Sequence, residues 1–355
     1  MLKKNIYIPI EFENRELVSQ LLLSIFAAKK GFRVYIGNFA CILKLLEKKK
    51  DRSGIFIVKG GLNIELTNFV KKKCEHYLVM DQEISPGFKN SYYINLTSNR
   101  FLEPTVKEID QYYCLNDNIL KAVKKNRIFT KYKIKSFKTG WPRVDTWLPI
   151  MKKFYEEKAS KIKKKHKDFI LFCSDFSVTS KDGFEEYSSD IPWGAQRKEV
   201  HKIKKKKLKE AKLLFQEYKK FINFLKIVDK NSKCPKILVR SHPGESLKGW
   251  RNDLKKLKNV IHLEPKDQID PYIYACKGFM HRGSTTAYQA ILAKKATSFL
   301  NLNKDIKKFE AHYKPSLMKI AKKISNPQDL ISWADDINYR KFKFSNYMKS
   351  NILKK

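Results

Sequence analysis

Three features that mark common protein classes are missing from this chain of 355 residues. Its six cysteines are widely spaced and form no C-x-x-C pair, which argues against a zinc knuckle and favours buried free thiols in a reducing compartment. The most apolar stretch, residues 17–28, contains Ser19, Gln20 and Ser24 and is too short to cross a bilayer. An acidic residue, Glu11, comes too early for a signal peptide. The sequence therefore predicts a cytoplasmic protein, either free or peripheral at the inner face of the plasma membrane.

Acidic residues are also scarce. The chain has 36 Asp and Glu residues against 75 Lys and Arg residues, and its formal net charge is +39. Such a charge implies an anionic partner, although part of the excess reflects a background rich in Lys, Ile and Asn. Nucleic acid is one partner that this charge allows. However, the lysines are spread along the chain and no nucleic-acid-binding module is recognised, so we expect no nucleic acid. An anionic membrane surface is an equally good partner.

Short apolar runs alternate with helical patterns along almost the whole chain, which predicts an α/β fold with parallel sheets. The first helix, residues 13–30, carries Leu17, Leu21, Ile25 and Ala28 at helical spacing. Residues 179–196 lack any period and are expected to form a long loop at a strand end, where functional residues are common. We expect strands at residues 6–10, 32–36, 54–58, 76–80, 112–115 and 134–139, and then at 168–173, 237–239, 260–263, 278–281 and 296–300.

The strands divide into two sets, and each set predicts one domain. Residues 1–150 are expected to form an N-terminal Rossmann-like domain, residues 151–325 a C-terminal Rossmann-like domain, and residues 326–355 a helical segment with a basic tail. Two Rossmann-like domains with parallel sheets facing across a cleft make up the GT-B-like architecture. GT-B glycosyltransferases and nucleotide-sugar epimerases share it, and the pattern alone does not separate them.

Residues 277–295 predict an anion-binding site. A short buried strand at 278–281 is followed by Gly283, which allows a tight turn, and by Ser284, Thr285 and Thr286, which can cap the next helix. The free N–H groups and the dipole of a helix N-terminus favour a negative charge there, and Arg282 would add a positive charge. An ordinary capped αβ unit explains the same residues equally well.

A second stretch, residues 236–245, favours the anion site. The buried strand 237–239 ends in Arg240 and His242, and Pro243-Gly244 then turns the chain away. Ligands of open α/β sheets bind beyond the carboxyl ends of the strands. One half of the molecule therefore offers two polar strand ends that suit phosphate.

Other polar residues follow strands or open helices. Asp81 and Glu83 leave the strand 76–80, and Asp175 leaves the strand 168–173. For Asp81 and Glu83 alike, an exposed acid with a purely structural role is an equally good explanation. Arg143 and Asp145 follow the turn at Gly140, and Arg15 and Glu16 open the first helix. For each of these two pairs, an ordinary salt bridge is an equally good explanation.

These motifs, taken in order, resemble the bacterial surface carbohydrate biosynthesis protein family. Residues 8–17 (I-P-I-E-F-E-N-R-E-L) are similar to its I-P-x-E-x-x-x-R-E-L, and residues 139–145 (T-G-W-P-R-V-D) to its T-G-N-P-R-x-D. Residues 240–245 (R-S-H-P-G-E) match its R-x-H-P-x-E, and residues 281–290 are similar to its H-x-x-x-T-T-A-x-E-A. The chain departs from the family where D-E-E-G reads Asp81-Gln82-Glu83-Ile84 and where E-A reads Gln289-Ala290. If the middle acid of the family's D-E-E-G motif has a role, that role is lost in this chain or passes to Glu83.

The resemblance implies a glycosyltransferase of GT-B type in the biosynthesis of lipopolysaccharide, O-antigen or capsule. Its motifs also resemble those of Kdo and sialic-acid transferases, so a CMP-linked acidic sugar is the expected donor and a saccharide or lipid-linked molecule the acceptor. The N-terminal domain would then hold the acceptor and the C-terminal domain the nucleotide sugar. The expected donor-binding residues are Arg240, His242, Pro243, Glu245, Arg282, Gly283, Ser284, Thr285 and Thr286. The expected base is Asp81 or Glu83, and the expected cleft-lining residues are Arg15, Glu16, Gly140, Arg143, Asp145 and Asp175.

We expect no cofactor besides the nucleotide-sugar substrate. We also expect no metal, because the sequence has no D-x-D motif and no His and carboxylate cluster with ligand spacing. Three alternatives stay open. A nucleotide-sugar 2-epimerase would need a richer set of carboxylates, a CDP-glycerol-type glycerophosphotransferase would also use a His-Pro strand end, and a nucleic-acid-binding protein would bind RNA or DNA in a salt-dependent way.

Overall fold

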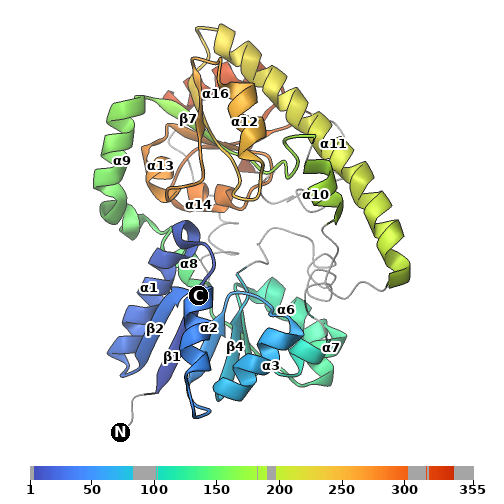
Figure 1. Ribbon diagram of the computed structural model, residues 1–355. Coiled ribbons are helices and arrows are strands. Elements are labelled where there is room, and N and C mark those ends of the chain that lie inside the picture. Colours follow the sequence, from blue (N-terminus) through green and yellow to red (C-terminus); the bar gives the residue numbers. More distant parts are fainter. Residues whose placement is uncertain are drawn as a thin grey trace. The chain divides into compact units, whose positions relative to one another are not determined.

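The computed structural model of the chain describes residues 4–82, 101, 103–181, 183–189, 197–302, 317 and 320–339. Contacts between Cα atoms divide the chain into two compact units, one of residues up to Thr146 and one that starts at Trp147. Within the described residues the strands form two parallel six-stranded sheets, one in each unit (Figure 1). The predicted α/β class with parallel sheets is therefore confirmed.

The sheet of the first unit has the strand order β2-β1-β3-β4-β5-β6. The chain moves from β1 to β2 in one direction and from β2 to β3 in the other. Since crossovers between parallel strands are right-handed, this reversal places α1 on one face of the sheet and α2 and α3 on the other. The strands are β1 (Asn5–Ile10), β2 (Arg33–Asn38), β3 (Ile55–Val58), β4 (His76–Met80), β5 (Gln111–Cys114) and β6 (Lys135–Lys138). The helices are α1 (Glu13–Lys29), α2 (Phe39–Glu47), α3 (Ile64–Lys73), α5 (Glu103–Val106), α6 (Asp117–Lys125), α7 (Arg127–Lys131) and α8 (Pro142–Asp145).

Asparagine side chains fix where several of these helices begin. An N-cap oxygen accepts a backbone N–H that has no partner inside the helix. Asn38 accepts from Ala40 (2.9 Å), Asn63 from Leu66 (2.8 Å) and Asn116 from Ile119 (3.0 Å). Asn38 is the last residue of β2, and Asn63 and Asn116 follow β3 and β5, so these caps lie at the carboxyl edge of the first sheet.

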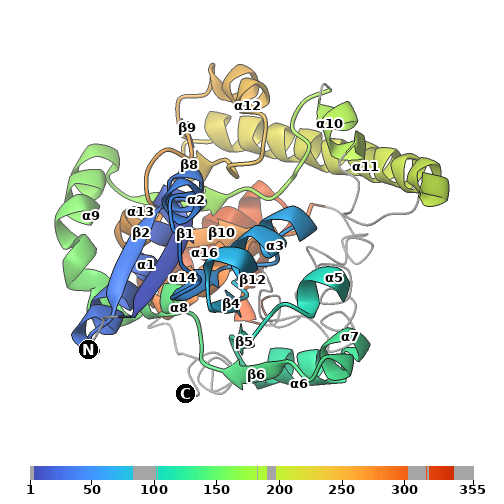
Figure 2. The same cartoon turned by 60° about the horizontal axis from the view of Figure 1, so that its bottom comes forward.

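The sheet of the second unit has the strand order β12-β11-β10-β7-β8-β9. Helices α11, α12 and α16 cover one face, and α13 and α14 cover the other, where α9 lies beside α13 (Figures 1 and 2). The strands are β7 (Phe169–Cys173), β8 (Lys236–Arg240), β9 (Val260–Leu263), β10 (Gly278–His281), β11 (Thr297–Leu300) and β12 (Lys322–Ile324). The helices are η1 (Pro149–Met151), α9 (Lys152–His166), α10 (Gly183–Ser189), α11 (Arg197–Lys230), α12 (Leu247–Leu254), α13 (Asp270–Ala275), α14 (Thr286–Leu292) and α16 (Pro327–Tyr339).

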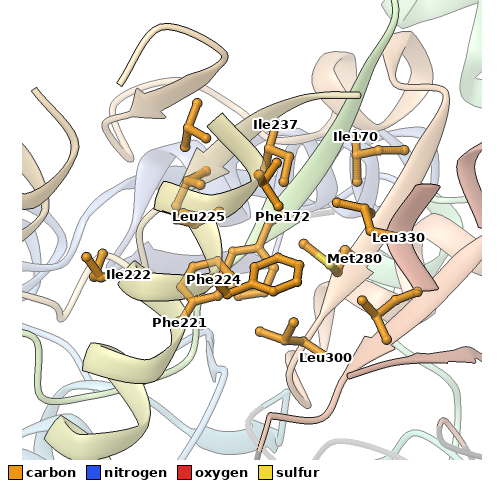
Figure 3. Close-up of a cluster of buried hydrophobic side chains, with 14 of the residues drawn as sticks. Ile170, Phe172, Phe221, Ile222, Phe224, Leu225, Ile237, Met280, Leu300 and Leu330 are labelled. Carbon is orange, nitrogen blue, oxygen red and sulfur yellow. The ribbon is translucent and has the colours of Figure 1, made fainter. Parts of the chain in front are cut away.

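The core of the second unit lies between its sheet and α11, α12 and α16 (Figure 3). Phe172 of β7 packs on Phe221 of α11, with ring centroids 4.3 Å apart. Trp250 of α12 is fully buried and meets the ring of Tyr218 edge-on at 4.9 Å. Leu330 of α16 joins the same cluster. Such close packing holds the strands of the second sheet, and hence their ends, in fixed positions.

One stretch of the second unit differs from expectation, and a second shows where a predicted helix packs. Residues 183–189 form a helix, α10, although the sequence there has no helical period. Phe184 of α10 meets Phe215 of α11 edge-on at 5.2 Å, so packing on α11 stabilises a helix that its own pattern does not predict. Leu330 and Trp333 of α16 are buried in the core, so the described part of the predicted C-terminal helical segment packs on the second sheet.

Helix α1 also differs from its pattern. Leu21 and Ile25, which the helical spacing groups together, are exposed. The buried residues of α1 are polar: Glu16, Ser19, Gln20 and Ser24.

All six cysteines are free thiols, and only Cys41 is exposed. Burial raises the pKa of the Cys74 and Cys276 thiols to about 11 and that of Cys173 to about 12. The structure thus contains the buried free thiols that the sequence predicts. Among the described helices, none is both long and apolar enough to span a bilayer.

Candidate functional site

The carboxyl ends of β7, β8 and β10 lie side by side, because β7 pairs with β8 on one side and with β10 on the other. The chain leaves these strands at Ser174, Ser241 and Arg282. The strand order reverses between β7 and β10. Open parallel sheets bind ligands at such a point, beyond the carboxyl ends of the strands. The two polar strand ends that the sequence predicts are therefore brought to one edge of one sheet.

Arg240 ends β8 with a side chain that is only 8% exposed. Its Nη2 donates to the carbonyl oxygen of Asp267, whereas its Nη1 is buried and has no hydrogen-bond partner in the described part of the chain. Burial lowers the pKa of the guanidinium, while nearby Cys173 and Tyr272 act in the opposite direction. An arginine nevertheless stays charged. A buried cationic N–H without an acceptor is costly, so Nη1 lacks the anion or carbonyl that its burial requires.

His242 lies two residues further on and is exposed. Its Nδ1 accepts the backbone N–H of Gly244 at 3.1 Å. In the neutral ring the proton then lies on Nε2, which can donate to a ligand. Pro243 and Gly244 are exposed beside it and carry the chain into the next turn.

Glu245 fixes the loops after β7 and β8 to each other. Its carboxylate is buried and accepts five hydrogen bonds. The donors are the Ser174 hydroxyl, the backbone N–H groups of Phe176 (2.7 Å), Ser177 (3.3 Å) and His242 (3.1 Å), and Trp250 Nε1 (2.9 Å). Both carboxylate oxygens are thus used within the protein, and Glu245 positions the backbone around His242.

Arg282, at the end of β10, is 2% exposed. Its Nε and Nη2 lie 3.0 and 2.7 Å from Oε2 of Glu217 on α11, and its Nη1 donates to the carbonyl oxygen of Asp175 at 2.8 Å. The guanidinium also lies over the ring of Phe176 at 4.9 Å. These contacts join the end of β10 to the end of β7, where Asp175 takes part through its backbone.

The turn after β10 has the form that the sequence predicts. Gly283 has a φ of +126°, which favours glycine, and its N–H donates to Nδ1 of His281 at 3.2 Å. The hydroxyl of Ser284 accepts the N–H of Thr286 at 3.3 Å and donates to the Thr286 hydroxyl at 3.2 Å. Thr285 is half-buried beside them. Hydroxyl groups therefore gather at the same sheet edge as Arg240, at the start of the short helix α14.

In the first unit, Glu16 lies at the beginning of α1 next to the ends of β1 and β3. It is 3% exposed and accepts the N–H groups of Glu11 (3.0 Å) and Phe12 (3.3 Å). Lys59, which follows β3, lies 2.7 Å from both Glu11 and Glu16. Arg15 lies over the Phe12 ring at 5.9 Å. Glu16 thus fixes the entry to α1 and pairs with a lysine that the sequence does not point out.

Asp81 follows β4 and is 1% exposed, with Oδ2 2.5 Å from the hydroxyl of Tyr112 on β5. Gln82 is also buried, and its Nε2 has no hydrogen-bond partner among the described residues. Glu83, the second predicted base, lies outside the described residues. The first sheet therefore has its own polar edge, with a buried acid and a buried amide.

The remaining predicted residues lie after β6. Gly140 has a φ of +77°, and its N–H donates to the carbonyl oxygen of Cys114 at 3.2 Å. Arg143 and Asp145 belong to the one-turn helix α8, where Arg143 is half-buried and Asp145 is exposed. The carbonyl oxygen of Arg143 accepts the Thr146 hydroxyl at 2.7 Å. Gly140, Arg143 and Asp145 thus belong to the same unit as Asp81, but they follow β6, whereas Asp81 follows β4.

Several residues that organise these edges were not identified from the sequence: Ser174, Glu217, Lys59 and Tyr112. Glu217 carries a signal that could have revealed it, because it lies three residues after Leu214 and four before Phe221 on the buried stripe of α11. A carboxylate on such a stripe needs a cation. Ser174, Lys59 and Tyr112 have no comparable signal, since their partners are far away in the sequence.

Comparisons with known proteins extend this description. No family model matches the chain, and no curated protein does. Solved structures do match. A variant of the wall teichoic acid polymerase TagF soaked with CDPG has a TM-score of 0.56 at 11% identity, covering 99% of this chain and 84% of that one. UDP-GlcNAc 2-epimerase from Methanocaldococcus jannaschii in complex with UDP-GlcNAc and UDP has a TM-score of 0.53 at 13% identity, covering 97% and 95%. The predicted GT-B-like fold is confirmed by this likeness.

Proposed function

We propose that this protein is a glycosyltransferase of surface polysaccharide biosynthesis that uses a nucleotide-activated sugar. The preferred donor is a CMP-linked acidic sugar, and the acceptor is a saccharide or a lipid-linked molecule. One observation carries the proposal: Arg240 Nη1 is buried and has no hydrogen-bond partner among the residues that the structure describes, at the sheet edge where parallel α/β folds bind ligands. A donor phosphate would supply the missing acceptor.

The neighbours of Arg240 support a phosphate. His242 is exposed and its Nδ1 is occupied by Gly244, which leaves Nε2 as the ring nitrogen for a ligand, and Ser284 brings a hydroxyl group to the same edge. As the bond from sugar to phosphate breaks, negative charge grows on the leaving phosphate. Donors that are already in position stabilise that charge without reorganisation. Among the predicted donor-binding residues, Arg240, His242 and Ser284 therefore take the phosphate. Glu245 and Arg282 hold the loops that position them.

The acceptor hydroxyl needs a base, and Asp81 is the described candidate. Its hydrogen bond from Tyr112 would orient the carboxylate. Asp81→Asn should abolish turnover and leave nucleotide affinity unchanged, because a base acts on the acceptor rather than on the donor. Tyr112→Phe serves as the control, since it removes only the orienting hydrogen bond and should cost less. An active Asp81→Asn variant would exclude Asp81 as the base.

A second candidate is a glycerophosphotransferase that uses a CDP-linked donor. The likeness to TagF soaked with CDPG favours it, together with a His-Pro strand end and hydroxyl groups at the next strand. A nucleotide-sugar 2-epimerase is the third candidate, because the M. jannaschii enzyme has the same fold. Both would place the donor phosphates at the same sheet edge, so the nucleotide that binds separates the candidates.

A thermal-shift panel of CMP, CDP, UDP and short RNA, with and without Mg²⁺, tests the proposal. A ligand at about 100 times its Kd stabilises by roughly 2.7 kcal/mol, which is readily measured. We expect a shift with CMP that Arg240→Lys removes and that Arg251→Lys, at an exposed arginine paired with Glu264, retains. A shift with UDP alone would favour the epimerase, one with CDP but not CMP the glycerophosphotransferase, and one with RNA alone that salt removes would exclude all three enzymes. Unchanged CMP affinity in Arg240→Lys would refute the site.

A further inference from the structure

Helix α1 exposes several large apolar residues to solvent, whereas its fully buried residues are polar. Leu21, Ile25 and Phe26 are 41%, 53% and 61% exposed. Surface helices of globular proteins normally do the reverse, with the apolar stripe facing the core. Figures 1 and 2 show α1 along the outside of the first unit, beside β2.

Most of the polar residues on the buried side of α1 have hydrogen-bond partners within the first unit, although Oε1 of Gln20 is buried without one in the described part of the chain. The Ser19 hydroxyl donates to the carbonyl oxygen of Glu16, and the Ser24 hydroxyl donates to that of Gln20, both at 2.7 Å. Glu16 pairs with Lys59. Small hydroxyl side chains also let the helix lie close to the sheet. The exposed apolar residues of α1 are therefore free to contact a partner outside the first unit.

Cations lie at the C-terminal end of this apolar side. Ile25 and Lys29 are one turn apart and exposed, whereas Arg15, Val18 and Leu22, which share that side by their spacing, are half-buried. Lys29 and the following Lys30 are exposed. The acids of the helix, Glu13 and Glu16, fall on the opposite side by the same count. Exposed apolar residues with cations at one end and no acid among them suit a helix that lies in a membrane interface.

We infer that the outer side of α1 docks on an anionic phospholipid surface. Leu21, Ile25 and Phe26 would enter the boundary between headgroups and acyl chains, while Lys29 and Lys30 contact lipid phosphates. A second copy of the chain fits this side less well, because pairing two such helices would bring the cations of one copy against those of the other. The net charge of +39 adds long-range attraction to an anionic bilayer and repulsion between copies.

Co-sedimentation with vesicles tests this inference on the full chain. We expect binding to vesicles of phosphatidylglycerol and phosphatidylcholine, and much weaker binding to phosphatidylcholine alone. Replacing Leu21, Ile25 and Phe26 together by Ser should lower the partition coefficient on the order of 100-fold, because the apolar anchors are lost. Lys29→Gln and Lys30→Gln together should lower it by roughly fivefold for each lysine.

Matched controls separate this side from the general positive charge. Phe137→Ser with Ile227→Ser removes two exposed apolar side chains elsewhere, and Lys204→Gln with Lys205→Gln removes two exposed charges of α11. Both controls should bind phosphatidylglycerol vesicles within a few-fold of the unchanged protein. Equal losses in the α1 variants and the controls would refute the inference, as would unchanged binding of the triple serine variant. If the unchanged protein were a dimer, and the triple serine variant were a monomer that still bound vesicles, the membrane inference would be refuted in favour of self-association through α1. Circular dichroism checks that the variants fold. If the triple serine variant does not fold, the vesicle binding of the two-lysine variant tests the inference alone.

Discussion

Arg282 and Glu217 form an ion pair in which both side chains are almost completely buried, with Nη2 2.7 Å from Oε2. The pair joins the end of β10 to α11, and the same guanidinium reaches the backbone of Asp175 after β7. Burial makes the two charges depend on each other, because neither has water to replace its partner.

Removing one member of this pair should therefore cost much more than removing both. We expect Arg282→Met to lower the free energy of unfolding by about 3–5 kcal/mol, since it leaves Glu217 buried without a cation. Adding Glu217→Leu should recover most of that loss. Urea unfolding of the single and double variants measures both effects, and equal losses would contradict the argument. The double variant also separates folding from function, because its nucleotide affinity tests whether Arg282 binds the donor.

Glu245 should behave as a structural anchor. Glu245→Ala leaves donors of two loops without an acceptor, and we expect a loss of about 3 kcal/mol or more in the free energy of unfolding. Glu245→Gln keeps one acceptor oxygen and should lose less. Glu264→Gln is the control, since that half-buried carboxylate pairs with the exposed cations Arg251 and Lys266 and should cost about 1 kcal/mol or less. If Glu245→Ala were as stable as the control, the hydrogen bonds described here would not hold the loops.

Gly249 leaves room for the loop after β7. A Cβ atom at this position of α12 would overlap the carbonyl oxygen of Thr179. Gly249→Ala should therefore destabilise by about 1–3 kcal/mol, because backbone has to move. Gly37→Ala in β2 is the matched control, since its nearest atom, Cδ1 of Ile42, is 4.0 Å away. Thermal unfolding of the two variants compares them, and similar midpoints would mean that the loop moves freely.

His262 should make stability depend on pH. Burial lowers its pKa below the usual 6.5, Glu264 partly opposes this and Arg251 adds to it. The unfolded chain then binds the proton more tightly than the folded protein does, so stability falls as the pH falls from 6.5 through the folded pKa. His262→Gln should reduce the loss of stability between pH 7.5 and pH 5.5, measured by urea unfolding at each pH. An unchanged loss would assign the effect to other groups, such as His166, whose pKa burial also lowers.

The sequence pattern predicts strands better than the faces of helices. Buried parallel strands are short apolar runs, and β7, β8 and β10 all lie where such runs occur. Helix α1 lies where its spacing predicts it, but spacing reports which residues share a side and not which side faces the protein. Helix α10 was missed because its stability comes from a contact with Phe215, which lies outside its own sequence.

The candidate site likewise contains residues that the sequence identifies and contacts that it does not. Arg240 and His242 were found from the sequence because a strand end is a local signal. The burial of Arg240 and the contacts of Glu245 depend on loops that meet only in the folded chain, such as the loop that carries Ser174. A sequence motif can identify the residues at the end of a strand. Only the folded structure distinguishes the residues that hold the loops in place from those that are available to bind a ligand.

The distribution of thiols provides a chemical handle. Only Cys41 is exposed, and burial raises the pKa of Cys74, Cys173 and Cys276, so these thiols are both covered and protonated at neutral pH. A maleimide added to the native protein therefore reacts at one position on α2, without any engineered cysteine. A dye placed there marks the first unit alone, and slow labelling of the buried thiols reports when either unit opens.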